Sequence, residues 1–232
     1  MYLSVVIPAF NEELRIIPTI SDSITYLRKQ NYEFEVIVVD DGSIDNTKKV
    51  VLELQKQFPE LSLESLEKNQ GKGTAVKAGM LKAAGQLHLF MDADGSTQIR
   101  EIEKLLPYIN NDFDIVIGSR ALNGNVVITT SIHRRLMGRI FNFFVNMLAL
   151  PSFYDTQCGF KLFSAKSSGI IFNKQQEKGF SFDVEILLLA VRNGFKIKEV
   201  AVNWHNVAGS KVSLVNDSLK MFWDILRISF RN

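Results

Sequence analysis

The chain has 232 residues, a net charge of +2 and a composition of 46% hydrophobic and 22% charged residues. Such a composition is typical of a globular protein and excludes an intrinsically disordered or collagen-like chain. The charge is too balanced for a protein whose main partner is a nucleic-acid backbone. The one cysteine, Cys158, cannot form an intrachain disulfide, which favours a reducing compartment. The sequence contains no run of about 18 uncharged apolar residues, so it predicts no transmembrane helix. We also expect no signal peptide.

The first half of the chain alternates short apolar runs with longer helical patterns. The runs, which are typical of buried strands, lie at 3–7, 34–39, 61–66, 87–91 and 114–117. The helical patterns between them cover 12–30, 45–58, 74–84 and 99–109. Each gap is long enough for the crossover helix that two parallel strands require. The alternation predicts an α/β fold with a doubly wound, mostly parallel sheet and helices on both faces.

The second half is less regular. The predicted elements are a helix at 131–150, a short strand at 160–163, a helix at 182–192, an alternating strand at 196–203 and an amphipathic helix at 213–230. Asn193-Gly194 is a typical helix stop signal. We predict one domain over 1–212, followed by a C-terminal amphipathic helix over 213–232.

Three of the predicted strands run into polar clusters. The clusters are Pro8-Ala9-Phe10-Asn11-Glu12-Glu13, Asp40-Asp41-Gly42-Ser43 and Asp92-Ala93-Asp94-Gly95-Ser96. Each cluster alone is also what a turn or a helix cap would show, since Asp, Asn, Gly and Ser favour both. In an open α/β sheet, however, ligands bind outside the carboxyl ends of the strands. Three clusters at such ends therefore predict one shared crevice.

Asp92 and Asp94 are spaced so that both carboxylates can reach one divalent ion at a strand end. Mg²⁺ and Mn²⁺ take one or two carboxylates, with diphosphate oxygens and water completing the shell. The alternative is a solvated turn. The three histidines are scattered, so no zinc site is predicted, and His88 within its strand is interpreted as structural.

The common nucleotide-binding motifs are incomplete. The first βα turn has no glycine, so the dinucleotide fingerprint is absent. Gly71-Lys72-Gly73 matches a phosphate loop only in part, because Leu66 stands at the first glycine position and Gly73 where Ser or Thr should follow the lysine. Hydride transfer and P-loop hydrolysis are both disfavoured.

Five short motifs follow one another along the first half of the chain. They are Val-Val-Ile-Pro-Ala-Phe-Asn-Glu-Glu at 5–13, Val-Asp-Asp-Gly-Ser at 39–43, Asn-Gln-Gly-Lys-Gly at 69–73, Asp-Ala-Asp at 92–94 and Gly-Ser-Arg at 118–120. In this order they resemble the family-2 glycosyltransferases of the GT-A fold. The segments at 155–161, 182–185, 202–204 and 209–211 are similar to the polyprenyl-phosphate members, the dolichyl-phosphate β-glucosyltransferases in particular.

The resemblance implies a role for each matching residue. The nucleotide sugar would be held by Pro8, Ala9, Phe10, Glu12, Val39, Asp41, Lys72, Asp92, Ala93, Asp94, Ser96, Arg120 and Lys211, with Asp41 on the base. Asp92 and Asp94 would bind the metal. The resemblance places Arg120 and Lys211 on phosphates. We predict the catalytic set Asp94, Arg120, Asp155 and Lys211, and three roles stay open for Asp155: accepting a proton, orienting the hydroxyls of the donor sugar or capping a turn. His205 stands where mannosyl relatives that use a GDP donor carry arginine, which favours a UDP-sugar.

A stretch of unbalanced positive charge indicates the acceptor. Residues 115–154 contain no Asp or Glu but four arginines, at 120, 134, 135 and 139. Such a stretch is typical of an anionic partner. We assign Arg134 and Arg135 to the acceptor phosphate, because guanidinium matches phosphate oxygens in a forked geometry. The alternative is a solvated helix face.

Two apolar segments suggest a membrane surface. The run at 140–150 is too short to span a bilayer and fits the interface. In the C-terminal helix the apolar stripe is Val215, Leu219, Phe222, Leu226 and Phe230, widened by Met221, Trp223, Ile225 and Ile228 and accompanied by Lys220, Arg227 and Arg231. Packing against the sheet is the alternative for both helices. We expect a peripheral protein on the cytoplasmic face of a membrane.

The resulting hypothesis is an inverting, metal-dependent transfer of a hexose, glucose first, from a UDP-sugar to a polyprenyl or dolichyl phosphate. A lipid phosphate is largely dianionic at pH 7 and needs no strong base. A hydroxyl acceptor would instead require Asp155, Asp183 or Glu185 as the base. Cys158 is interpreted as a packed residue rather than a nucleophile.

Other functions stay open at this point. Within the same chemistry they are transfer from GDP-mannose, transfer from UDP-GlcNAc, and transfer to a saccharide hydroxyl. A non-catalytic nucleotide-sugar binding module and a nucleotidyltransferase are the alternatives of other classes. Lipid length and oligomeric state are not determined by the sequence.

Overall fold

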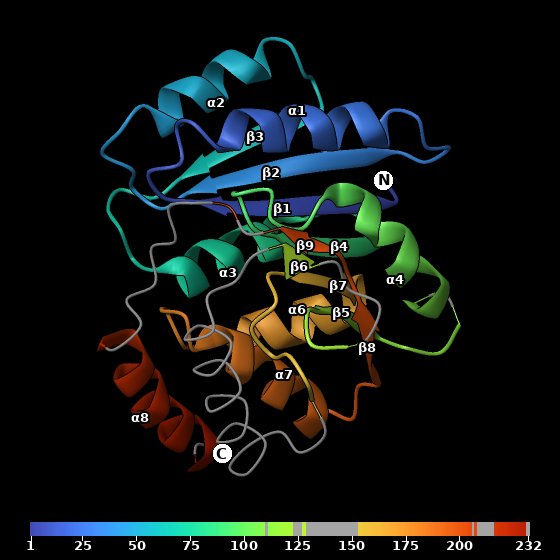
Figure 1. The fold of residues 1–232 in the computed structure, drawn as a ribbon, viewed down its shortest axis with the longest axis vertical. Coiled ribbons are helices and arrows are strands. Elements are labelled where there is room, and N and C mark those ends of the chain that lie inside the picture. Colours follow the sequence, from blue (N-terminus) through green and yellow to red (C-terminus); the bar gives the residue numbers. More distant parts are fainter. Residues whose placement is uncertain (110, 123–126, 129–152, 206, 208–215, 231–232) are drawn as a thin grey trace.

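The computed structural model describes all residues except 110, 123–126, 129–152, 206, 208–215 and 231–232 (Figure 1). The strands are β1 (Leu3–Ala9), β2 (Phe34–Asp40), β3 (Leu61–Ser65), β4 (Leu87–Met91), β5 (Ile115–Ser119), β6 (Val127–Ile128), β7 (Phe160–Ser164), β8 (Ile197–Ala201) and β9 (Trp204–His205). The helices are α1 (Ile16–Leu27), α2 (Thr47–Gln55), α3 (Lys72–Lys82), the 3₁₀ turn η1 (Ile99–Glu101), α4 (Ile102–Ile109), α6 (Ala165–Lys174), α7 (Phe182–Arg192) and α8 (Asn216–Phe230).

The main sheet has seven strands in the order β3-β2-β1-β4-β7-β5-β8. Its pairs are parallel except those of β7, which runs antiparallel to both β4 and β5. The predicted doubly wound, mostly parallel sheet is confirmed. The strand order reverses between β1 and β4, because β2 and β3 lie on one side of β1 and β4 on the other. Such a switch point is where open α/β sheets bind their ligands.

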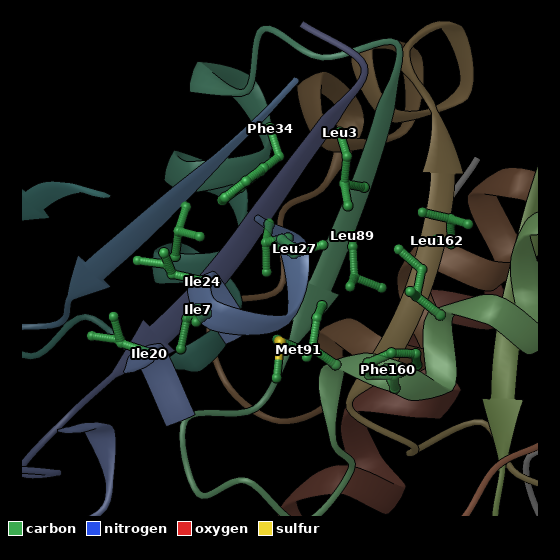
Figure 2. Close-up of a cluster of buried hydrophobic side chains, with 14 of the residues drawn as sticks. Leu3, Ile7, Ile20, Ile24, Leu27, Phe34, Leu89, Met91, Phe160 and Leu162 are labelled. Carbon is green, nitrogen blue, oxygen red and sulfur yellow. The ribbon is translucent and has the colours of Figure 1, made fainter. Parts of the chain in front are cut away.

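Helices cover both faces of this sheet, and a separate hydrophobic core lies between each face and its helices. Side chains that alternate along a strand point to opposite faces, so Val5 and Ile7 belong to one core and Val6 to the other. The first core lies under α1, α2 and α4, and Figure 2 shows Ile20, Ile24 and Leu27 of α1 facing the strand residues. The second core lies under α3, α6 and α7. The predicted two-faced arrangement is therefore confirmed.

Some elements differ from the sequence-based prediction. The helix α6 was not predicted, and neither were the two short strands β6 and β9, which pair with each other. Helix α6 has a weak apolar pattern, AKSSGIIFNK, and begins where the Ser164 side chain accepts a hydrogen bond from the Ser167 amide at 3.2 Å. The predicted helix at 131–150 lies outside the described residues.

The C-terminal helix α8 packs along α7, at the lower left of Figure 1. The described side chains that it buries are Ile225 and Ile228. Trp223 and Phe230 of the predicted apolar surface are 69% and 83% exposed. Within the described part of the chain, no helix is both long and apolar enough to cross a bilayer.

Candidate active site

A cleft of ≈ 570 Å³ opens at the carboxyl ends of β1, β2 and β4. This volume is in the range of about 300–1,000 Å³ that small-molecule sites occupy. Predicted site residues that line it are Pro8, Ala9, Phe10, Glu12, Asp41, Lys72, Asp92, Ala93, Asp94, Ser96 and Arg120. The three polar clusters therefore do share one crevice, as predicted. Val39 does not line it and is buried in the second core.

The loops after β1 and β2 hold each other by reciprocal hydrogen bonds. The Asn11 amide donates to Ser43 Oγ at 2.8 Å, and the Ile44 amide donates to Asn11 Oδ1 at 2.9 Å. Asn11 has a φ of 53°, in the left-handed region that asparagine tolerates better than most residues. Arg15 donates a fork of two bonds of 2.6 Å to the Glu12 carboxylate. These bonds fix the shape of one end of the cleft.

Asp41 ties the loop after β2 to the segment that leads into α3. Its carboxylate accepts hydrogen bonds from the amides of Gln70 at 2.8 Å and Gly71 at 2.9 Å. Burial raises the pKa of Asp41, and the two amide bonds oppose that rise. A Cβ on Gly42, whose φ is +68°, would lie 2.4 Å from the backbone carbon of Lys68, so the two segments can approach only at a glycine. The role of Asp41 on a base stays a prediction.

Asp92 and Asp94 follow β4 directly and project into the cleft. Lys72 Nζ lies 2.7 Å from Asp92 Oδ1. Asp94 Oδ1 accepts a hydrogen bond from the Ser96 amide at 2.9 Å. Burial, and next the neighbouring Asp92 carboxylate, raise the pKa of Asp94. A cation held between the two carboxylates would relieve this electrostatic cost.

These two side chains fit a divalent cation that is shared with a diphosphate. They offer hard carboxylate oxygens, and Mg²⁺ commonly takes only one or two of these, with substrate phosphates completing the shell. The Lys72 ammonium beside Asp92 shows that this carboxylate attracts a cation in the structure. Among the described residues, no group of three or more His, Cys, Asp and Glu gathers to hold a metal.

A buried ion pair, Lys161 with Asp183, lies next to the pair of Lys72 and Asp92. Lys161, the second residue of β7, donates to Asp183 Oδ1 and to the Cys158 carbonyl oxygen, the latter at 2.7 Å. The two side chains are 0% and 3% exposed, and Asp183 lines the cleft. Burial raises the pKa of Asp183, and the charges of Lys161 and Lys72 oppose the rise. Sequence reasoning missed Lys161, although a lysine inside the apolar run Phe-Lys-Leu-Phe is itself a signal.

Arg120 and Asp155 form a further ion pair of the site. Arg120 Nε and Nη2 donate to the two oxygens of Asp155 at 2.7 and 2.9 Å, and the Arg120 amide donates at 2.9 Å. Burial raises the pKa of Asp155, but the Arg120 guanidinium outweighs it and holds this pKa below the usual range. The guanidinium also lies 5.7 Å from the ring centre of Trp204, another lining residue that sequence reasoning missed. Asp155 therefore orients Arg120 in this structure.

The remaining residues considered in the sequence analysis have different surroundings. Glu185 accepts hydrogen bonds from the Gln176 and Glu177 amides, so its carboxylate serves the backbone. Burial raises the pKa of Cys158 to about 12, which agrees with a packed residue. His88, interpreted as structural, is buried and bonded through its ring to Ser168 Oγ and the Gly85 carbonyl. Arg134, Arg135 and Lys211 lie outside the described residues.

Residues 4–169 match the glycosyl transferase family 2 domain. The chain belongs to glycosyl transferase family 2. Among curated members, it is 38% identical to the dolichyl-phosphate beta-glucosyltransferase of Dictyostelium discoideum, over 100% of this chain and 75% of the relative. The Saccharomyces cerevisiae relative of the same name is 39% identical over 98% and 74% of the two chains. The Homo sapiens relative is 37% identical over 99% and 75%. The chain is therefore a glycosyltransferase, as its motifs predict.

Solved structures agree on the GT-A fold. Glucosyl-3-phosphoglycerate synthase from Mycobacterium tuberculosis in complex with uridine diphosphate is 18% identical, with a TM-score of 0.71 over 98% of this chain and 80% of that one. The same enzyme in complex with Mn²⁺, UDP-glucose and phosphoglyceric acid is 19% identical, with a TM-score of 0.72 over 98% and 79%. The fold prediction is confirmed.

Substitution of Gly159 tests whether the position of the Asp92 carboxylate matters for glycosyl transfer. A Cβ at position 159 would lie 2.0 Å from Asp92 Oδ2, so Gly159→Ala must displace that carboxylate. Because small misplacements in a reacting site are costly, we expect kcat/KM for glycosyl transfer to fall at least about tenfold. Steady-state kinetics measures it. The control is Gly169→Ala in α6, where the added Cβ meets nothing within 4 Å and should raise stability by about 0.5–1 kcal/mol. If Gly159→Ala had the kinetics of the parent, the assignment of Asp92 to the active site would be contradicted.

Proposed function

We propose that the chain transfers a hexose, glucose first, from a UDP-sugar to a polyprenyl phosphate of the dolichyl type. The observation that carries the proposal is one cleft at the sheet's switch point that holds Asp92, Asp94 and Arg120 together. Two carboxylates and a guanidinium are groups that suit a metal-bridged diphosphate. The curated relatives, named for glucosyl transfer to dolichyl phosphate, support this choice of donor sugar and acceptor.

On the donor side, the proposal gives the nucleoside to the β1 and β2 loops and the diphosphate to the β4 loop. Asp92 and Asp94 would hold Mg²⁺ or Mn²⁺, which neutralises the charge that grows on a departing diphosphate. Arg120, oriented by Asp155, adds a fixed positive charge in the same cleft. The assignment of Lys211 to the phosphates stays a prediction from the resemblance.

On the acceptor side, a phosphate oxygen of the lipid would attack the anomeric carbon with inversion. A phosphate monoester has its second pKa near about 6 and is largely dianionic at pH 7, so the reaction needs no strong base. The partners of the three candidate bases agree with a reaction that needs no strong base. Asp155 pairs with Arg120, Asp183 pairs with Lys161 and Glu185 accepts two backbone amides. Arg134 and Arg135 stay our candidates for the acceptor phosphate.

A lipid acceptor places the enzyme at a membrane, and the proposal includes peripheral attachment on the cytoplasmic face. Helix α8 supports it, because Trp223 and Phe230 are exposed on the side away from the buried Ile225 and Ile228. Aromatic side chains of this kind favour the membrane–water interface.

The proposal is tested by supplying radiolabelled UDP-glucose, UDP-GlcNAc or GDP-mannose with dolichyl phosphate and Mg²⁺ or Mn²⁺. We expect a labelled glucosyl lipid from UDP-glucose and at most trace product from the other two donors. Product from none of the three would reject the lipid-phosphate acceptor. Pyrophosphate release from a nucleoside triphosphate would instead support a nucleotidyltransferase.

A further inference from the structure

One wall of the cleft is an irregular segment between α6 and α7. The segment covers residues 175–181, and its Gly179 and Phe180 line the cleft. It lies between the two helices and belongs to neither, so its position depends on the groups to which it is bonded. Three neighbours hold it. Glu185 of α7 accepts hydrogen bonds from the Gln176 and Glu177 amides, and the other two neighbours are the first turn of α3 and the helix α8.

The contact with α3 joins this wall to the lysine beside Asp92. The Gly73 amide donates to the Lys178 carbonyl at 2.8 Å, and the Gln175 side chain donates to the Gly73 carbonyl at 2.9 Å. A Cβ on Gly73 would lie 2.4 Å from the Glu177 carbonyl oxygen, and one on Gly71 would lie 2.4 Å from that of Lys178. Lys72 sits between these two glycines, so a shift of the wall moves the residue that pairs with Asp92.

The contact with α8 is electrostatic. Arg227 Nη2 lies 2.7 Å from Glu177 Oε2 and 2.9 Å from Oε1. The same nitrogen lies 3.1 Å from Asp224 Oδ1, and Asp224 Oδ2 accepts a hydrogen bond from Ser181 Oγ at 2.8 Å. Helix α8 is thus bonded to residues on both sides of the cleft-lining pair 179–180. The Glu177 side chain is only 6% exposed, against 56% for Arg227, so the positive charge of α8 meets a buried carboxylate of the wall.

We propose that Arg227 is a positioning residue for donor binding, which acts by clamping the segment 175–181 through Glu177. The inference rests on the proposed function in one respect, namely that this cleft binds the nucleotide sugar. Arg227 does not line the cleft, so its effect must pass through the wall. An interaction that only shapes the binding wall stabilises the bound donor and the transition state equally, and its loss appears in KM rather than in kcat.

The test uses the full chain in four forms. Arg227→Met keeps the length of the stem and removes the charge, Arg227→Lys keeps the charge and removes the fork, and Arg227→Met with Glu177→Gln removes both charges. Arg192→Met is the matched control, because Arg192 Nη2 donates to the Ser229 carbonyl at 2.8 Å and so joins the C-terminal ends of α7 and α8. Each form is titrated calorimetrically with UDP and Mn²⁺, and KM and kcat for UDP-glucose are measured beside the thermal midpoint.

We expect Arg227→Met to raise KM and the UDP dissociation constant on the order of fivefold, with kcat within about twofold of the parent. Arg227→Lys should lie between that variant and the parent. The double variant should recover part of the affinity, because the Glu177 charge that Arg227 balances is removed together with the Arg227 charge. Arg192→Met should bind like the parent.

Two results would overturn the clamp. One is parental UDP affinity in Arg227→Met, and the other is an equal loss of affinity in Arg192→Met, which would show a general weakening of α8. If Arg227→Met fails to fold, Asp224→Asn carries the same test, since Asp224 bonds both Arg227 and Ser181. A parent that binds UDP but transfers no glucose would fail the proposed function and leave the clamp standing on its affinity data. A parent that binds no nucleotide would overturn both.

Discussion

Asp94→Asn is expected to lower kcat/KM for glucosyl transfer by about two to three orders of magnitude, the scale of losing one electrostatic contact to a developing charge. The substitution is isosteric and keeps an oxygen for the Ser96 amide, which donates to Asp94 at 2.9 Å. It removes one of the two carboxylates proposed for the cation. It also removes repulsion from Asp92, which contributes to the raised pKa of Asp94, so the free energy of unfolding should not fall. Initial rates with Mg²⁺ or Mn²⁺ measure the effect.

The controls for this prediction separate the metal from the fold. Asp112→Asn changes an exposed carboxylate before β5 and should leave the rates at the parental value. A chelator should abolish transfer by the parent, and added Mg²⁺ or Mn²⁺ should restore it. Transfer at full rate in the chelator, or in Asp94→Asn, would remove the basis of the proposed function. A non-catalytic binding module would bind UDP-glucose and release no product under any of these conditions.

Lys161→Met is expected to cost about 3–5 kcal/mol of unfolding free energy, the typical loss when one partner of a buried ion pair is removed. The pair is almost wholly buried, with side chains 0% and 3% exposed. Without the ammonium, the Asp183 carboxylate loses the strongest charge that opposes its desolvation. Denaturant unfolding at pH 7 measures the loss.

Two comparisons show whether burial is the cause. Lys161→Met with Asp183→Leu should regain most of the lost stability, because replacing both partners leaves no uncompensated charge. Lys82→Met removes a surface pair with Glu64, in which the side chains are 51% and 38% exposed, and should cost under about 1 kcal/mol. Similar losses for Lys161→Met and Lys82→Met would contradict the importance of the buried pair.

The loss of unfolding free energy in Lys161→Met should also depend on pH, and it should be smaller in acid than at neutral pH. Burial already raises the pKa of Asp183 above its ordinary 3.8, and losing Lys161 raises it further. An acid with a raised pKa in the folded state binds its proton more tightly there than in the unfolded chain. Stability is therefore lost as the pH rises through the folded pKa. The difference between variant and parent should be largest near neutral pH and shrink on acidification towards 3.8.

The sequence-based prediction succeeded where the signal is local. The apolar runs of β1, β2 and β4 mark strands that are buried on both faces, and the polar residues after each run mark the end of the sheet at which they gather. Asp92 and Asp94 could be picked out for the same reason, since their spacing and their place after a strand are both properties of neighbouring residues. The C-terminal helix was also recognised from its period.

By itself, the sequence determined the strand and helix segments of the first half, the polar cleft residues and, through its motifs, the family. Tertiary structure alone decided that β7 runs antiparallel, that Lys161 lies opposite Asp183, that Arg120 pairs with Asp155 and that Arg227 reaches Glu177. These pairs are separated by 22 to 50 residues, as given by their hydrogen bonds. The physical reason is that periodicity reports which face of an element is buried, whereas the partner across that face is chosen only when distant segments pack together.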